Sequence, residues 1–311
     1  MTAVPRFSKT EHAKGIEVVI FFLITVTGMI LAHFNQEAMV FMVSALQPAF
    51  LLVFLLRRIF KRKENPPYSF IFIFVGLFLW TLSALASILV DSEGFKALHY
   101  EGAIVAIILG VGSRLIPGIL GHVEIVQSQR EKYEKPLPIL KTVPWYFFLL
   151  VLSFVTSYFL DERIGSIIRA LVVGTIGFGY WKLFSKPKDK TALTWNIWIS
   201  SWCIVLSFLL KGIWIDGYIH GSHAFFLSGI VLLSLLIATR VIQSHGPKDK
   251  NLENWNGLYV VSGLIILAAI TRVTAFLMPE SYLTHLGYSS VILGISIIIW
   301  SIKYIRFVKV Y

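Results

Sequence analysis

Residues 220–245 read HGSHAFFLSGIVLLSLLIATRVIQSH, and this stretch predicts a membrane-spanning helix. Between His223 and His245 the only charged residue is Arg240, which lies near the far end. At ~1.5 Å of rise per residue, a helix of about 20 apolar residues crosses the hydrocarbon core of a bilayer. Histidine stands at both ends of this helix, since His220 and His223 open it and His245 closes it.

Residues 99–122 repeat the same layout earlier in the chain. His99 opens an apolar stretch with glycines in its middle, Arg114 lies toward its far end, and His122 closes it. Two predicted helices therefore share an outer histidine, a glycine-containing middle, an arginine and a closing histidine. This repetition is the most informative feature of the sequence.

The composition places the chain in the membrane. Of its 311 residues, 56% are hydrophobic and only 14% are charged, which is too apolar for a soluble globular domain. The net charge of +11 comes from short basic clusters between apolar runs, a pattern that sets membrane topology and does not indicate a nucleic-acid partner. The single cysteine, Cys203, excludes disulfides within the chain, and the absence of Cys-x-x-Cys-His excludes covalently attached haem.

Ten apolar runs are long enough to be transmembrane helices. The first is too long for a signal peptide core, so we interpret it as a retained helix. The ten runs cover residues 16–33, 38–57, 68–90, 98–121, 143–160, 163–182, 193–211, 219–241, 256–277 and 282–303.

Basic residues fall in every second loop and in both terminal tails, which predicts that both termini are cytoplasmic. The expected fold class is an all-α membrane protein, a polytopic bundle of about ten transmembrane helices. A long loop at 123–142, interrupted by Pro136 and Pro138, divides the bundle. We expect an N-terminal half with helices 1–4 over 1–122 and a C-terminal half with helices 5–10 over 143–311.

This topology sorts the histidines into two layers. Helix ends on the outer side carry His33, His99, His220, His223 and His285, whereas His122 and His245 lie at inner ends. Since ~33 Å of helix rise separates the two layers, no single site can include both. Neutral imidazole binds iron, copper and zinc, and His220 and His223 at i,i+3 share a helix face. We expect the outer histidines to converge in one layer and hold a metal; the alternative is that they only bind water at headgroup depth.

Arginines inside the apolar runs give a second signal. Arg114, Arg169 and Arg272 lie within predicted helices, where a buried guanidinium needs an anionic partner. Haem propionates would be suitable partners, because guanidinium binds carboxylate in a bidentate manner. Snorkelling to headgroups is the alternative, and it accounts for Arg169 and Arg240 and in part for Arg272. Glu101, close to His99, is either a proton-relay carboxylate or an interfacial acid.

Over residues 193–306 the sequence resembles the NnrS family of bacterial membrane proteins, and the likeness is looser over 68–122. It rests on His223, Gly229, Thr239-Arg240, Ser244-His245, Arg272 and Trp300, and on His99, Glu101, Gly110 and Pro117 in the looser part. His245 is followed by Gly246-Pro247-Lys248, whereas the family motif commonly continues His-Thr-Gly-Arg. With fewer helices than is usual in the family, the chain is identified as a short or divergent member.

The resemblance implies a protein of the bacterial inner membrane that binds non-covalent b-type haem, with copper as a further cofactor, and handles nitric oxide or nitrosative stress. Its partners would be the lipid bilayer, a gaseous ligand such as nitric oxide and an electron donor in the membrane. The expected haem-binding residues are His99, His122, His223, His245, Arg114, Arg240 and Arg272. The expected metal ligands are His33, His99, His220, His223 and His285.

Two rival functions stay open. A redox or gas sensor, or an interaction protein, would bind haem without turnover, so haem binding alone leaves catalysis undecided. A secondary transporter would need broken helices and polar residues at mid-membrane. The helix middles contain few ionisable residues apart from Arg114, which disfavours a transporter.

Overall fold

A computed structural model describes most of the chain, and every regular element within the described residues is helical. The described residues are 10–34, 37–63, 66, 68–90, 92–125, 143–214, 218–245 and 252–307. Each of the ten predicted runs coincides with a helix, so the predicted all-α class is confirmed.

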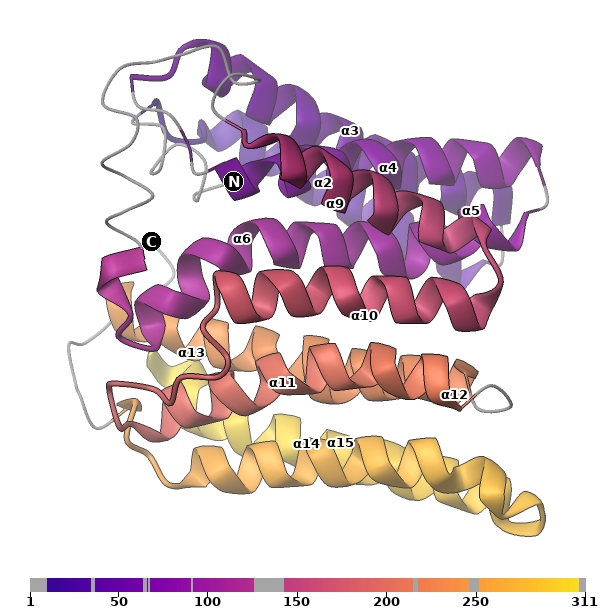
Figure 1. The fold of residues 1–311 in the computed structure, drawn as a ribbon, viewed down its shortest axis with the longest axis vertical. Helices are drawn as coiled ribbons and strands as arrows, with labels where there is room; N and C mark the ends of the chain where they lie inside the picture. The colour runs from indigo at the N-terminus through magenta and orange to yellow at the C-terminus, as the bar shows by residue number, and fades with distance from the viewer. Residues whose placement is uncertain are drawn as a thin grey trace. The chain divides into compact units, whose positions relative to one another are not determined.

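The first compact unit consists of Met1–Leu115 and Glu124–Leu160 (Figure 1). Within it α3 packs against both α2 and α4, and α4 also packs against η2. Leu55, Ile59, Phe70, Ile73 and Leu77 form a buried core where α3 and α4 meet. Its helices are α2 (Gly15–His33), α3 (Glu37–Phe60), η1 (Tyr68–Phe70) with α4 (Ile71–Leu89), α5 (Glu93–Ala97) with η2 (Leu98–Gly102) and most of α6 (Ala103–Ile119), and α9 (Trp145–Thr156) with η3 (Ser157–Phe159).

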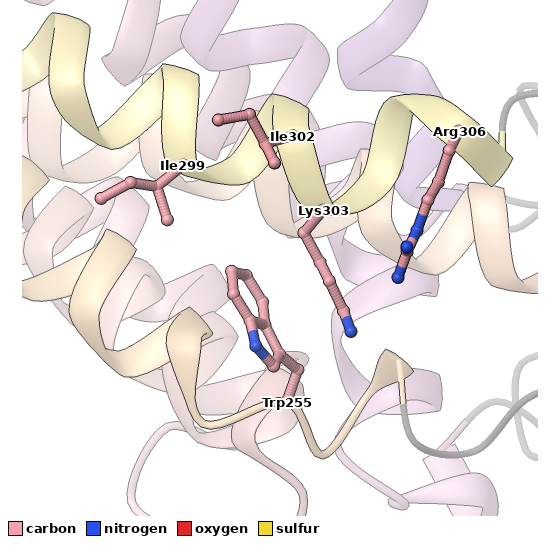
Figure 2. A pocket seen from close by; sticks show the side chains of 5 residues that line it. All are labelled: Trp255, Ile299, Ile302, Lys303 and Arg306. Atoms are coloured by element: carbon pink, nitrogen blue, oxygen red, sulfur yellow. The ribbon is translucent and has the colours of Figure 1, made fainter.

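The second compact unit consists of Ile116–Val123 and Asp161–Tyr311. Within it α10 packs along α11, α14 packs along α15, and α12 contacts both α11 and α14. A pocket lies where the start of α14 meets the end of α15 (Figure 2). Its helices are α10 (Glu162–Gly179), α11 (Ala192–Ile213), α12 (Tyr218–Ala224) with η5 (Phe225–Val231) and α13 (Leu232–His245), α14 (Gly257–Thr274) with η7 (Ala275–Leu277), and η8 (Pro279–Ser281) with α15 (Tyr282–Tyr304) and η9 (Ile305–Phe307).

Among the described residues, eight helices are long and apolar enough to span a membrane. Two of the ten predicted spans fall short of that standard. The fifth, Trp145–Phe159, is apolar but shorter, and the sixth, α10, carries Glu162, Arg163 and Arg169. Large apolar side chains face outward, including Phe22 at 63% exposure on α2, a helix with no buried residue. The protein is an all-α polytopic membrane protein, since lipid can cover such surfaces.

The compact units group the fifth predicted helix with the first four, whereas the predicted halves placed it with the last five. Most of the predicted connecting loop, residues 126–142, lies outside the described residues.

Both repeated helices contain a π-helical segment at or near the histidines that open them. In the first helix the segment is Leu98–Gly102, and the Ala103 N–H donates to the Leu98 carbonyl five residues back. In the second helix it is Phe225–Val231, where the Leu232 N–H reaches the Leu227 carbonyl. A π turn widens the helix and re-aims the side chains around it, and such turns often occur at functional sites. The repeat seen in the sequence is thus also a repeat of backbone geometry.

Candidate functional site

The second unit brings two of the predicted ligands together at the start of its histidine-bearing helix. His220 and His223 lie on α12, and their ring centroids are 6.3 Å apart. Two imidazoles that bind one metal ion through ~2.0–2.1 Å bonds have centroids roughly 5–6.5 Å apart. The distance between the two rings therefore falls at the upper end of that range. We call His220, His223 and the α14 residue Arg272 the α12 histidine site.

Arg272 contacts the ring of His223 directly. Its Nη2 lies 3.2 Å from Nε2 of His223. A guanidinium can only donate, so Nε2 must accept and the ring is neutral with its proton on Nδ1. The lone pair that accepts this hydrogen bond is the one that would bind a metal. A metal at Nε2 would therefore displace the guanidinium and release it toward an anion.

Aromatic rings wall in His220. Its ring stacks on Phe276 with centroids 4.6 Å apart and planes 15° apart, and Tyr282 approaches edge-on at 6.3 Å. Trp214 packs on Phe276 in turn, with the two ring centroids 4.6 Å apart. These rings keep water from one side of the imidazole. The Nδ1 atom of His220 is buried and has no hydrogen-bond partner among the described residues.

His285 belongs to the neighbouring helix α15. It lies one turn after Tyr282, so the two side chains share a helix face. Because Tyr282 contacts His220, this face is directed toward the α12 histidine site. The Nδ1 atom of His285 is also buried without a hydrogen-bond partner in the described part of the chain. An orphaned buried nitrogen calls for a partner such as water or an ion.

Helix α11 supports the π segment that follows the histidines. The Ser200 hydroxyl donates to the Ser228 carbonyl at 3.1 Å and to the Gly229 carbonyl at 3.0 Å. A side chain at Gly229 would not fit, because its Cβ would lie 2.9 Å from Cγ1 of Ile204. The small glycine and the serine hydroxyl therefore hold the widened turn against α11.

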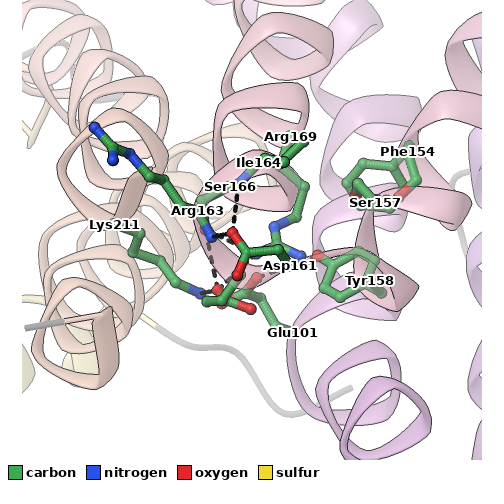
Figure 3. A network of polar contacts seen from close by, with 11 residues as sticks. Glu101, Phe154, Ser157, Tyr158, Asp161, Arg163, Ile164, Ser166, Arg169 and Lys211 are labelled. Atoms are coloured by element: carbon green, nitrogen blue, oxygen red, sulfur yellow. Dashed lines mark hydrogen bonds and ion pairs between the residues drawn. The ribbon is translucent and has the colours of Figure 1, made fainter. Parts of the chain in front are cut away.

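A partly buried charge network adjoins the same site (Figure 3). Asp161 caps α10 by accepting from two backbone N–H groups, and Glu162 then accepts from Ser166 at 3.0 Å and from Arg169 at 2.6 Å. Lys211 of α11 lies 3.4 Å from the same carboxylate. Its side chain fills the space beside Gly221, since a Cβ there would lie 2.5 Å from Cγ of Lys211. Basic side chains thus border the α12 histidine site on α11 and on α14.

In the first unit, His99 lies in an aromatic cluster. Its ring contacts Phe41 at 5.5 Å, Trp80 at 6.3 Å and Tyr100 at 5.0 Å. The side chain is 6% exposed, and its Nδ1 has no hydrogen-bond partner within the described residues. His99 is therefore a buried imidazole with one free nitrogen, as a ligand would be.

Glu101 follows His99 in the same π segment and is buried. Its carboxylate accepts from the Tyr158 hydroxyl at 3.2 Å, a contact drawn in Figure 3. Tyr158 also packs where Gly102 has no side chain, because a Cβ there would lie 3.0 Å from its ring. Burial and this hydrogen bond argue against the interpretation of Glu101 as a merely interfacial acid.

The remaining histidines occupy helix ends. His33 is exposed at the end of α2, with its ring 5.5 Å from that of Phe34. His122 is 4% exposed. It follows Gly121, whose left-handed conformation (φ of +82°) stops α6 from continuing. The His122 N–H donates to the Pro117 carbonyl, which is the geometry of a Schellman motif. His245 is the last residue of α13, and its side chain lies outside the described residues.

The other two predicted propionate partners differ from Arg272. Arg240 forms an ion pair with Glu253 and donates to Gln243 at 2.9 Å, so a protein carboxylate already occupies it. Arg114 is half-buried and lies in the last two turns of α6.

Among the described residues, no group of three histidine, cysteine or acidic side chains is arranged to hold a metal ion. The structure brings together His220, His223 and Arg272, and it places His285 on a face directed toward them. The convergence of all five outer histidines in one layer stays a prediction.

Sequence reasoning missed the groups that position the histidines. Phe276 and Tyr282 contact His220. Ser200 bonds to the π segment after the histidines, and Tyr158 bonds to Glu101. The sequence offers few signals for these four residues. The spacing of Arg272 and Phe276, one turn apart on one helix face, is the signal that could have linked that helix to His220.

Comparison with known proteins gives one match. A family model described as NnrS protein matches residues 1–309. No curated protein and no solved structure matches the chain significantly.

Proposed function

The chain belongs to the NnrS family, and from this membership we propose that it is a membrane haem protein, with copper as a further cofactor, that handles nitric oxide in nitrosative stress. The observation that supports this most is the α12 histidine site. There two imidazoles lie 6.3 Å apart, and the guanidinium of Arg272 lies 3.2 Å from a ring nitrogen.

The residues of the site fit such a cofactor. Imidazole is a ligand of both haem iron and copper, and guanidinium is suited to propionate. The Nδ1 atoms of His220 and His285 are buried and without hydrogen bonds among the described residues, so they are available as ligand atoms. The fit is to a pair of imidazoles with nearby cations, and it does not extend to a preassembled three-ligand cluster.

We assign each residue a role. His223 would bind haem iron through Nε2, while Arg272 turns from that nitrogen to a propionate. When bound, the haem would supply an iron that takes up nitric oxide. Phe276 and Tyr282 would exclude water from His220, because their rings already cover it. The π segment would fix the helix so that both imidazoles point to one place.

The remaining predicted ligands keep their proposed roles. In the first unit, buried His99 would bind haem or metal, with His33 as a further ligand and Arg114 as a propionate partner. On the inner side, His122 and His245 are proposed ligands. Arg240 could serve a propionate only by leaving Glu253. His285 would complete the metal site on α12.

We also propose the cell location. The basic clusters predict that both termini are cytoplasmic and that the chain crosses the bacterial inner membrane. An electron donor in the same membrane would be required for turnover of nitric oxide. The gas itself would reach the site through the lipid.

A visible absorption spectrum of the purified protein tests the proposal. The protein is expressed with an ample haem supply, and the expected result is a Soret band that shifts when nitric oxide is added. The absence of a Soret band in folded protein would refute haem binding.

Gas consumption then distinguishes an enzyme from a sensor. Stoichiometric loss of nitric oxide with an artificial electron donor would indicate turnover. A spectral shift without loss of the gas would favour the sensor function.

A further inference from the structure

A pocket of about 280 Å³ lies between the residues that precede α14 and the end of α15. Figure 2 shows Trp255 facing the α15 side chains across this pocket. None of the candidate ligands whose side chains the structure describes lines this pocket. Its lining residues are Trp255, Ile299, Ile302, Lys303 and Arg306.

The aromatic wall of the pocket is held in place. The ring of Trp255 packs edge-on against that of Tyr304 with centroids 5.7 Å apart. The Tyr304 hydroxyl donates to the Leu252 carbonyl at 2.8 Å, which ties α15 to the segment before α14. Gly257 is required beneath the indole, because a Cβ there would overlap the Trp255 ring. The wall is therefore formed before any ligand arrives.

The pocket has a cationic part, formed by Lys303 and Arg306, and an apolar part, formed by Ile299 and Ile302. Lys303 and Arg306 lie at i,i+3, so they share one helix face. The Lys303 ammonium lies 5.5 Å from the centre of the Trp255 ring. Ile302 is 71% exposed, which suits contact with lipid and not with water. Among the described residues that line the pocket none is acidic, so an anion there would meet the two cations Lys303 and Arg306.

We propose that this pocket binds one anionic phospholipid. Its phosphate would lie between Lys303 and Arg306, since guanidinium and ammonium groups both bind phosphate. The start of an acyl chain would lie along Ile299 and Ile302, with the indole of Trp255 at headgroup depth. A volume of about 280 Å³ holds only the part of a lipid nearest its headgroup, and the bilayer takes the rest.

Two features favour a lipid over a free anion. The pocket lies at the end of a membrane-spanning helix, where basic pockets meet anionic headgroups. Its isoleucines would also make no favourable contact with inorganic phosphate, which has no apolar part. The proposal is independent of haem, so the two can fail separately.

Native mass spectrometry of the detergent-purified protein tests this binding. Phosphatidylglycerol and phosphatidylcholine with identical chains are added together, and bound lipids are counted for each variant. We expect the wild type to retain phosphatidylglycerol preferentially. The double variant Lys303→Gln with Arg306→Gln should reduce this preference about 30-fold, which corresponds to about 1 kcal/mol for each cation.

Two matched variants control for charge and folding. Lys186→Gln with Lys190→Gln removes the same charge from exposed positions before α11 and should leave the preference unchanged. Lys303→Arg with Arg306→Lys keeps both charges in the pocket and should retain it. Equal preference in the wild type and the pocket variant would overturn the proposal. Displacement of phosphatidylglycerol by inorganic phosphate would also overturn it, because the ligand would then be a free anion.

Discussion

The hydroxyl of Ser200 offers the sharpest structural prediction, because it bridges α11 to the π segment beyond the histidines. It donates to the Ser228 and Gly229 carbonyls, at 3.1 and 3.0 Å. The Gly229 carbonyl also accepts from the Leu232 N–H, so Ser200→Ala removes a hydroxyl donor from a carbonyl that keeps a backbone partner. Side-chain hydrogen bonds between membrane helices contribute ~0.6 kcal/mol on average and at most about 1.7. We therefore expect Ser200→Ala to cost about 1 kcal/mol of unfolding free energy.

Ser201 provides the matched control. It is adjacent on α11, equally buried at 0% exposure, and its hydroxyl bonds only within its own helix, to the Ile197 carbonyl. Because the Ile197 carbonyl remains within the regular helix when the hydroxyl is removed, Ser201→Ala should cost less than ~0.5 kcal/mol of unfolding free energy. Both variants are compared by denaturant unfolding in micelles, followed by tryptophan fluorescence. Equal losses in the two variants would refute the claim that Ser200 supports the π segment.

Two further predictions concern a helix end and the α12 histidine site. Gly121→Ala should cost about 1–2 kcal/mol of unfolding free energy, because alanine is strained at a φ of +82° and its Cβ would press on Lys188. Thermal unfolding measures this loss, and Gly263→Ala, whose Cβ meets open space, is the control that should lose no stability. Arg272→Leu should raise the Zn²⁺ affinity of haem-free protein at least about tenfold, since a charge-assisted hydrogen bond no longer competes for Nε2 of His223. Isothermal titration measures that affinity, and a lower affinity would show that the guanidinium does not compete.

Much of the fold could be predicted because lipid imposes a simple pattern. A helix in hydrocarbon must satisfy its backbone internally and be apolar over its whole length, so each span is visible as a run. The sixth run shows the limit of this reasoning. Its charged residues Glu162 and Arg169 pair with each other, which only tertiary structure reveals.

The geometry of the candidate site was less predictable. The i,i+3 spacing of His220 and His223 correctly indicated a shared face, and their rings are indeed neighbours. The π segment after them depends on a hydroxyl of another helix, which leaves no periodicity in the sequence. Arg240 likewise pairs with Glu253, thirteen residues further along the chain.

The central claim is that His223 holds haem iron, and counting haem per chain tests it most directly. The wild type, His223→Ala and His12→Ala are purified side by side, and haem is measured against protein. His12 is exposed before α2 and contributes its carbonyl to Arg58, so its variant should match the wild type. We expect His223→Ala to lose at least one haem per chain. An unchanged haem content in folded His223→Ala would contradict it.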